Sequence, residues 1–276
     1  MSTIILRDIP KHRVQLDRVV YPVGSGFRGF QNVLPGFHIV QVFSSDSSRT
    51  LRAELVLANS SSVVVLIAED EHLIIDHSSD GEEMASMAAS GVMNRSLVDA
   101  LAGQSKEVAL WHAITSELES PLSDLPPSLA GYAQSQGLSR FERFWLEHTA
   151  DSHSAMRTLQ AAFIQAIFYQ DGDATSRLRE LLQAHYNAGE RGVRLAADYF
   201  PLFAEWLSAV ASWVPELFRP GSAAQEGIRY LVEDLRDVGR ASENMALKSA
   251  ADKLGETVDP DEKSSEQSKT PKESLS

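Results

Sequence analysis

VGSGFRGFQNVLPGFHIVQV, residues 23–42, is the stretch of sequence that decides the fold. It holds a G-x-G-x-x-G string over 24–29, and a Pro35-Gly36 pair follows six residues later. The dinucleotide-binding fingerprint requires a helix that opens within the glycines, because the helix N-terminus binds the pyrophosphate. Pro35-Gly36 leaves no room for such a helix, and residues 37–43 alternate as a strand does. The pattern therefore favours strand–turn–strand over cofactor binding.

Short strand-like runs surround this stretch on both sides. Apolar or alternating segments of this kind lie at 4–9, 14–21, 37–43, 51–57, 62–68 and 72–76. Proline, glycine, serine and acidic residues separate them, as turns require. Strands of this length and spacing predict an N-terminal antiparallel β-sandwich-like domain.

The pattern changes to helical spacing after residue 78. Apolar residues recur every three or four positions over 84–92 and 97–118, which predicts one or two helices appended to the β-rich domain. Residues 120–139 concentrate proline, serine and glycine. We therefore predict a β-rich N-terminal domain over 1–119 and a linker over 120–139.

The rest of the chain predicts an all-α helical bundle over 140–255. Helical spacing recurs at 140–147, 156–169, 173–185, 193–213 and 223–254. Pro201 is expected to kink the fourth of these helices or to start a new one. Residues 256–276 have almost no apolar side chains, which predicts a disordered acidic tail. The fold class is therefore α+β, with the β-rich domain first.

Composition excludes several classes of function. The formal net charge of −13 argues against direct nucleic-acid binding, which needs clustered Lys and Arg. The chain has no cysteine, so disulfides, thiolate zinc sites and cysteine nucleophiles are excluded. It has neither a signal peptide nor an apolar run near the roughly 20 residues of a membrane helix. We predict a soluble, intracellular protein that does not enter a membrane.

No arrangement of titratable residues predicts chemistry. His148, Asp151 and His153 form H-x-x-D-x-H, but helical spacing turns His153 away, so a solvated helix end is favoured over a metal site. The acidic residues of 70–80 are interpreted as a solvated loop. His38 lies among apolar strand residues, where a hydrogen-bonded core histidine is the expectation. We predict no catalytic residues, no metal and no cofactor.

One family pattern is nevertheless present in the N-terminal region. It consists of a strand that ends in proline, an aspartate seven residues before a glycine, Phe-Arg-Gly, Pro-Gly-x-His, and an apolar strand that ends in serines. The matching residues are Ile9-Pro10, Asp17, Gly24, Phe27-Arg28-Gly29, Pro35-Gly36-Phe37-His38 and Ser44-Ser45. In order and spacing this region resembles the N-terminal domain of the Aar-two family of splicing factors. Residues 159–163 and 206–218 give a less distinctive resemblance in the helical half.

The resemblance implies a non-enzymatic assembly chaperone. Members of the family hold the RNase H-like and MPN-like domains of the spliceosomal protein Prp-eight while the U-five small nuclear ribonucleoprotein matures. The implied location is the cytoplasm, with a nuclear connection, and the chain alone is expected to be a monomer. An acidic surface suits a basic protein partner better than it suits RNA.

Two questions stay open at this point: the role of the family residues, and the alternatives to the chaperone function. We expect these residues to be mainly structural, with glycines that permit tight turns and aromatics that fill the core, rather than direct partner contacts. One alternative function is a helical scaffold with an unrelated protein partner. The other is a small-molecule-binding module that uses the Gly24–Gly29 turn.

Overall fold

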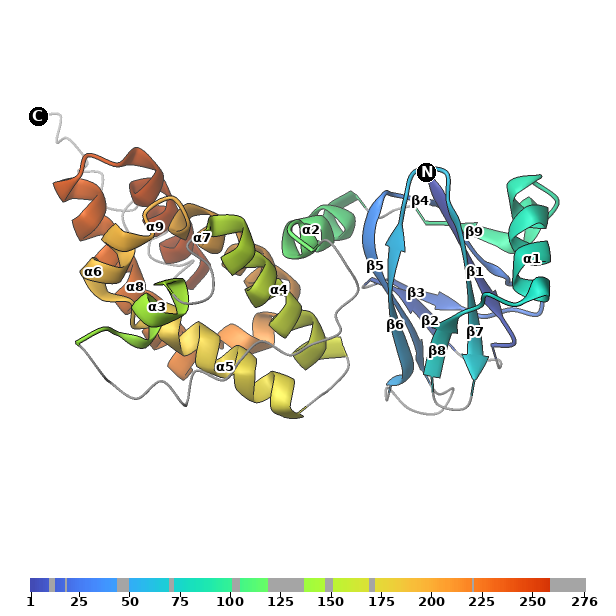
Figure 1. Ribbon diagram of the computed structural model, residues 1–276, viewed down its shortest axis with the longest axis horizontal. Helices are drawn as coiled ribbons and strands as arrows, with labels where there is room; N and C mark the ends of the chain where they lie inside the picture. The colour runs from blue at the N-terminus through green and yellow to red at the C-terminus, as the bar shows by residue number, and fades with distance from the viewer. Residues whose placement is uncertain are drawn as a thin grey trace, which may run out of the picture. The chain divides into compact units, whose positions relative to one another are not determined.

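The computed structural model divides the chain into two compact units, Met1–Ser123 and Asp124–Ser276. The residues that it describes are 1–9, 13–17, 19–43, 50–69, 72–100, 105–118, 137–146, 151–168, 172–219 and 221–258. Strands dominate the first unit and helices the second (Figure 1), so the expected α+β class is confirmed. The predicted linker at 120–139 and the predicted tail at 256–276 lie mostly outside the described residues.

Two sheets form the N-terminal unit. The first has the strand order β8-β7-β1-β4-β9, and the second has the order β3-β2-β5-β6. The strands of the first sheet are β1 (Ser2–Arg7), β4 (Gly29–Val33), β7 (Val63–Glu69), β8 (His72–Ile75) and β9 (Leu97–Asp99). Those of the second are β2 (Arg13–Leu16), β3 (Val19–Pro22), β5 (Gly36–Phe43) and β6 (Thr50–Ala58).

The pairing is antiparallel in the second sheet but mixed in the first. Strands β1 and β4 pair antiparallel, as do β7 and β8. Strand β1 runs parallel to β7, however, and β4 runs parallel to β9, which corrects the expectation of a purely antiparallel domain. Parallel neighbours need a long crossover connection. The second sheet lies within the connection from β1 to β7, and helix α1 (Ser79–Ala89) lies within that from β4 to β9.

The core lies between the two sheets, and a helix covers the outer face of each. The buried residues of the sandwich interior are Ile4, Leu6, Val14, Leu16, Phe30, Val33, Val40, Val42, Val56, Ala58, Leu66, Leu73 and Ala100. On the other face of the first sheet, Ile5 and Val65 pack with Ala88 of α1. Helix α2 (Ser105–Thr115) packs on β5, where the indole of Trp111 donates to the carbonyl of Phe37.

Three segments of this unit differ from the sequence expectation. The single strand expected over 14–21 is the hairpin of β2 and β3, because Asp17 takes the left-handed conformation, with φ 55°, and turns the chain. Part of the glycine-rich stretch is itself a strand, β4. Residues 97–99, expected as helix, form β9, which follows the short helix η1 (Asn94–Ser96).

The described residues of the C-terminal unit form helices joined by turns, with no strand among them. Its helices are α3 (Arg140–Phe144), α4 (Ser152–Phe168), α5 (Gly172–Tyr186), α6 (Gly189–Leu195), α7 (Phe200–Trp213), η3 (Pro215–Phe218), α8 (Ala223–Ala241) and α9 (Met245–Val258). Pro201 lies in the first turn of α7, so the expectation that it starts a new helix is confirmed.

The helix expected over 223–254 is two helices. Glu243 has φ 55°, which ends α8, and the side chain of Asn244 then accepts hydrogen bonds from the backbone amides of Ala246 and Leu247. Such a capping side chain starts a new helix, here α9. Residues 256–258, assigned to the tail by sequence, are the last residues of α9.

A buried histidine and tyrosine lie at the centre of this unit. The Nδ1 atom of His185 lies 2.6 Å from the carbonyl oxygen of Leu181, and its Nε2 lies 2.6 Å from the hydroxyl oxygen of Tyr199. Burial lowers the pKa of His185 to about 4. The neutral ring therefore donates to the carbonyl and accepts from the tyrosine, so this polar pair is satisfied within the core.

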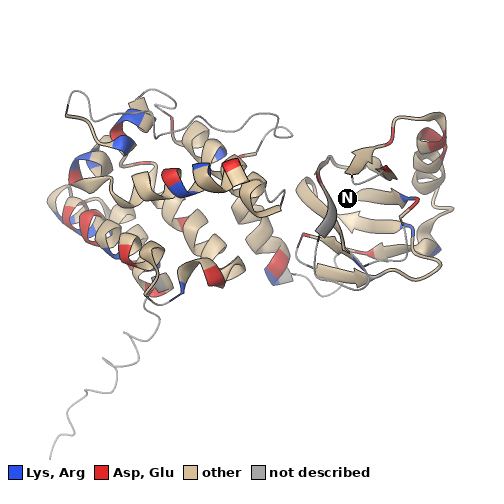
Figure 2. Cartoon of the chain, turned by 90° about the horizontal axis from the view of Figure 1, so that it is seen from below, with Lys and Arg blue, Asp and Glu red and all other residues tan. Residues whose placement is uncertain are grey.

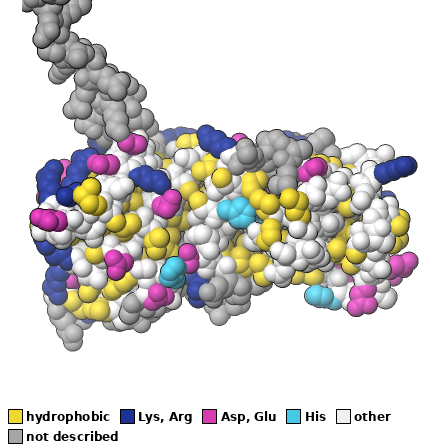
Figure 3. All heavy atoms as spheres, turned by 90° about the horizontal axis from the view of Figure 1, so that it is seen from above, with side chains coloured by type: hydrophobic (Ala, Val, Ile, Leu, Met, Phe, Trp, Pro, Cys, Tyr) yellow, Lys and Arg dark blue, Asp and Glu magenta, His cyan; other side chains and the backbone are white. Residues whose placement is uncertain are grey.

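Charges of both signs are intermixed on the helices of the C-terminal unit (Figure 2). The face drawn in Figure 3 likewise places hydrophobic side chains among acidic and basic ones. Across the residues that the structure describes, no helix combines the length and the apolar character needed to span a bilayer.

A half-buried carboxyl on β6 makes the stability of the N-terminal unit sensitive to pH. Glu54 is directly opposite Val40, whose side chain lies in the sandwich interior, and burial raises the pKa of Glu54 to about 7 from an ordinary value of 4.5. Folding therefore favours the protonated form, and stability falls as pH rises from 4.5 to about 7. Glu54→Gln should raise the melting temperature by about 2–6 °C at pH 8.

The same substitution should have little effect at pH 4, where the wild-type carboxyl is already protonated. Thermal melts by circular dichroism at the two pH values measure the difference. Glu69→Gln is the control, because Glu69 is on a strand of the same unit but is exposed. A shift of equal size at both pH values would contradict the assignment.

Candidate functional site

The most distinctive polar contact of the family residues joins Asp17 to His38. The Oδ2 atom of Asp17 lies 2.9 Å from Nδ1 of His38, and Oδ1 accepts from the backbone amide of Ile39 at 3.1 Å. Nε2 of His38 lies 2.7 Å from the carbonyl oxygen of Leu34. Both side chains are buried. The contact ties the hairpin turn after β2 to the middle of β5.

The geometry identifies the protonation state of His38. Both ring nitrogens face acceptors, a carboxylate and a carbonyl, so both must carry hydrogens. Burial lowers the pKa of His38, but the charge and the hydrogen bond of Asp17 outweigh it, and the pKa is raised overall. Burial and the nearby His38 lower the pKa of His112, whose ring centre is 6.1 Å from that of His38.

This buried ion pair has no room for a substrate. The cavity beside it, lined by Leu34, Ala100 and Val108 among others, has a volume of about 10 Å³. That is about the space of a single water molecule. The arrangement therefore positions the backbone of β5 rather than performing a reaction.

Gly29 occupies the closest backbone approach among these residues. Its φ is +141°, and a Cβ built on it would lie 2.1 Å from the carbonyl oxygen of Ile4. No side chain fits there, because the obstructing atoms belong to the backbone of β1. Gly36 is less constrained: its φ is +132°, and a Cβ would lie 3.0 Å from the ring of His112.

The other family residues hold the turn from Val23 to Arg28 or lie at the surface. The amide of Phe27 donates to the carbonyl of Gly24 at 3.1 Å, and the ring of Phe27 meets Phe30 edge-on, with centres 5.4 Å apart. The amide of Arg28 donates to Ser96 at 2.9 Å, while its side chain is exposed. Pro35 is exposed as well.

The structure thus unites Asp17 and His38 but forms no reactive group from the family residues. Gly29 begins strand β4, so no helix N-terminus follows the glycines within this turn. The turn therefore lacks the geometry by which a glycine-rich loop binds phosphate. Gly24 and Gly26 are exposed, and a Cβ on either would meet nothing within 4 Å.

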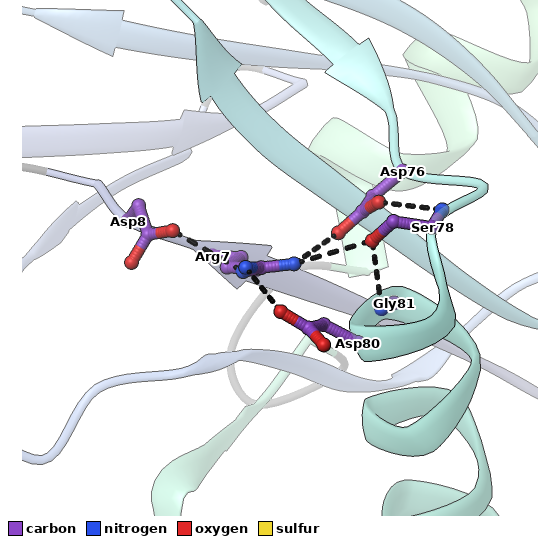
Figure 4. Close-up of polar contacts among 6 residues, drawn as sticks. All are labelled: Arg7, Asp8, Asp76, Ser78, Asp80 and Gly81. Carbon is purple, nitrogen blue, oxygen red and sulfur yellow. Dashed lines mark hydrogen bonds and ion pairs between the residues drawn. The ribbon is translucent and has the colours of Figure 1, made fainter.

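A second polar cluster surrounds Arg7 at the end of β1 (Figure 4). Its guanidinium forms ion pairs with the carboxylates of Asp76 and Asp80, each at 2.9 Å, and with that of Asp8 at 3.2 Å. Ser78, the N-cap of α1, accepts from the amide of Gly81 at 3.2 Å and donates its own amide to Asp76 at 2.9 Å. These bonds, with the charge of Arg7, lower the pKa of Asp76.

The expectation that the acidic residues of 70–80 form a solvated loop is therefore partly wrong. Asp76 has a side-chain exposure of only 5% and binds Arg7, 69 residues earlier in the chain. The cluster fixes the start of α1 against β1. In the part of the chain that the structure describes, no three His, Cys, Asp or Glu side chains are grouped to hold a metal ion.

The residues of the H-x-x-D-x-H motif do not form a site in the described structure. His148 lies outside the described residues. The Oδ2 atom of Asp151 accepts from the amide of Ser154 at 2.9 Å, and Asp151 is exposed. This carboxylate therefore caps the start of α4, in agreement with the interpretation as a solvated helix end.

The C-terminal unit contains an apolar groove that the sequence reasoning missed. Its volume is about 500 Å³, within the usual range for binding pockets. Helices α4, α5, α7, η3 and α8 line it with residues that include Phe163, Ile167, Leu178, Leu182, Trp206, Val210, Leu217 and Tyr230. The i, i+4, i+8 spacing of Leu178, Leu182 and Tyr186 was the available signal. That spacing alone equally indicates an ordinary core-facing helix.

Comparison with known proteins identifies the first unit. Residues 1–125 match the AAR2 N-terminal domain. The matched segment covers the whole of Met1–Ser123, including the Asp17–His38 pair and Gly29. No curated protein matches the chain.

Proposed function

The chain belongs to the AAR2 family through its first 125 residues, and from this membership we propose that it is an assembly chaperone of Prp-eight. The family is one of splicing-related assembly factors without enzymatic activity. In the proposed function, the chain binds the RNase H-like and MPN-like domains of Prp-eight while the U-five particle matures. It does so in the cytoplasm, with a nuclear connection.

The match over residues 1–125 is the observation that carries this proposal. Two features of the chain support it. The polar clusters at His38 and Arg7 are satisfied by their own neighbours and tie strands and a helix together, as a binding scaffold requires. The net charge of −13 favours a partner with a basic surface.

Size-exclusion chromatography with purified proteins tests the proposal. We expect the chain to co-elute with a fragment that contains both Prp-eight domains, with a Kd on the order of 1 μM or tighter. Because the chain is acidic, added salt should weaken the complex. The isolated RNase H-like and MPN-like domains, each tested alone, show which one contributes. Separate elution of the folded proteins at concentrations of about 10 μM would contradict the proposal.

A further inference from the structure

The apolar groove of the C-terminal unit is long and open. Helix α5 lines it from Thr175 to Tyr186, which at 1.5 Å per residue is about 17 Å. Buried residues of α4 and α7, such as Phe163 and Trp206, form its floor. It closes where α8 approaches α5, because a Cβ on Gly227 would lie 2.7 Å from the ring of Tyr186. The groove is therefore about three helical turns in length.

Its exposed lining residues include opposite charges on two different helices. Arg179 lies on the α5 side and Glu226 on the α8 side, and both are exposed. Within the described residues, neither side chain makes an ion pair, and the guanidinium of Arg179 makes no hydrogen bond. Among the residues that the structure describes, the carboxylate of Glu226 accepts a hydrogen bond only from the hydroxyl of Tyr230, at 3.5 Å. An occupant that matches this rim has an acidic flank on one side and a basic flank on the other.

Large apolar side chains are exposed at the mouth of the groove. Tyr230 is 56% exposed and Leu217 is 37% exposed, although both line the apolar surface. Tyrosine at the edge of an apolar pocket is typical of protein–protein contacts. A small-molecule site, by contrast, encloses most of its ligand around a few convergent polar groups. Here the charged groups are exposed on the rim.

We propose that this groove binds an amphipathic helix of a protein partner. The apolar residues of that helix, at i, i+4, i+7 and i+11, lie along the wall formed by α5. An acidic residue on one flank faces Arg179, and a basic residue on the other faces Glu226. This inference deepens the proposed function, on which it rests for its biological setting, by naming a surface and the kind of partner segment that it takes.

Two synthetic helical peptides test the proposal by charge exchange. Both peptides have leucines at i, i+4, i+7 and i+11. In one peptide, glutamates lie on one side of the leucine stripe and lysines on the other side. In the second peptide, the glutamates and lysines are exchanged. Fluorescence anisotropy with the full chain should show that one peptide binds about tenfold more tightly. In the double variant Arg179→Glu with Glu226→Arg, that preference should invert. Both substituted residues are exposed, so the fold should be retained.

A matched pair of leucines separates the groove from general apolar attraction. Leu217→Ala at the mouth should lower the affinity for the preferred peptide about tenfold. Leu195→Ala should leave its affinity unchanged, because Leu195 is equally exposed, at 41%, but lies on α6 outside the groove. In addition, hydrogen exchange of the full chain with the preferred peptide should show new protection over 175–187 and 223–230.

Several results would overturn the proposal. They are no binding of either peptide at concentrations of about 1 mM, a preference that does not invert in the double variant, or an affinity for the preferred peptide that Leu217→Ala leaves unchanged. Binding of palmitate in the groove without binding of the peptides would identify an acyl chain as the occupant instead. None of these assays contains Prp-eight, so their failure is distinct from separate elution of the Prp-eight domains.

Discussion

We expect Gly29→Ala to unfold the N-terminal unit under conditions in which the wild-type chain is folded. At φ +141° the backbone conformation is one that residues with a side chain rarely adopt. The added Cβ would also lie 2.1 Å from the carbonyl oxygen of Ile4 and 2.9 Å from the Cα of Ile5. Strand β1 lies at the centre of its sheet, between β7 and β4, so it cannot move away alone. A cost above about 4 kcal/mol follows.

Hydrogen exchange of the full chain reports the loss of folded structure in each unit separately. Amides of 1–118 should lose protection, whereas those of 137–258 should keep it, because the two units are separately compact. Gly26→Ala is the matched control: Gly26 lies in the turn that leads to Gly29, has no positive φ, and its added Cβ would lie in open space. Its effect should be within about 0.5 kcal/mol. Equal protection in the two variants would refute the close approach.

The strands found by sequence were those with a clear alternation or a continuous apolar run. Residues 37–43 alternate well, and β5 spans Gly36–Phe43. Strand β4 was missed because its sequence, GFQNV, places Gln31 and Asn32 in succession, and Asn32 has a left-handed φ of 59°. Strand β9 is only three residues long and ends in an aspartate. Strands this short or irregular give no usable periodicity.

Helix boundaries were harder to predict than helices. The apolar stripe of α8 and α9 is continuous in the sequence, so it reads as one helix over 223–254. The break depends on Glu243 and Asn244, whose conformation and capping bonds end one helix and start the next. Asparagine before an apolar stripe is a recognised start signal, and it was the available clue.

The long-range features could not be derived from local patterns. Arg7 and Asp76 are 69 residues apart, and nothing near either residue indicates their ion pair. The parallel pairing of β1 with β7 depends on the long connection between them in the sequence, which contains all the strands of the second sheet. The groove requires side chains from five elements of the C-terminal unit. By contrast, His38 has the environment expected of a hydrogen-bonded histidine in a core strand.

Among the proposed substitutions, replacement of Asp17 should cause the second-largest loss of folding stability, after Gly29→Ala. Asp17→Ala removes the carboxylate that faces His38 and leaves the amide of Ile39 without its side-chain acceptor. It also places alanine at φ 55°, where aspartate and asparagine are better tolerated. Breaking a buried pair in this way typically costs about 3–5 kcal/mol, because the remaining charge is left uncompensated. Urea denaturation followed by the fluorescence of Trp111, in a chain whose other tryptophans are phenylalanine, measures this loss.

Two variants separate the charge from the backbone conformation. Asp17→Asn keeps the turn preference and an acceptor for Ile39, so it should cost less than Asp17→Ala. Asp8→Ala is the matched backbone control: Asp8 has φ 54°, and its side chain is 67% exposed, so losing its surface ion pair with Arg7 should add little. The destabilisation should therefore be smaller than that of Asp17→Ala. If Asp8→Ala destabilises as strongly, the backbone conformation rather than the ion pair explains the effect.

The pH dependence of Asp17→Asn provides the sharper test of the pair. Because Asp17 raises the pKa of His38 above its ordinary value of 6.5, the stabilisation is fully present below pH 6.5 and is lost as pH rises through the folded-state pKa. The difference in unfolding free energy between wild type and Asp17→Asn should therefore be largest near pH 6 and should narrow at higher pH. A difference that stays constant from pH 6 to pH 9 would mean that His38 is neutral in the folded protein. One of its ring nitrogens would then face an acceptor without a hydrogen to donate, which the contacts with Asp17 and Leu34 make unfavourable.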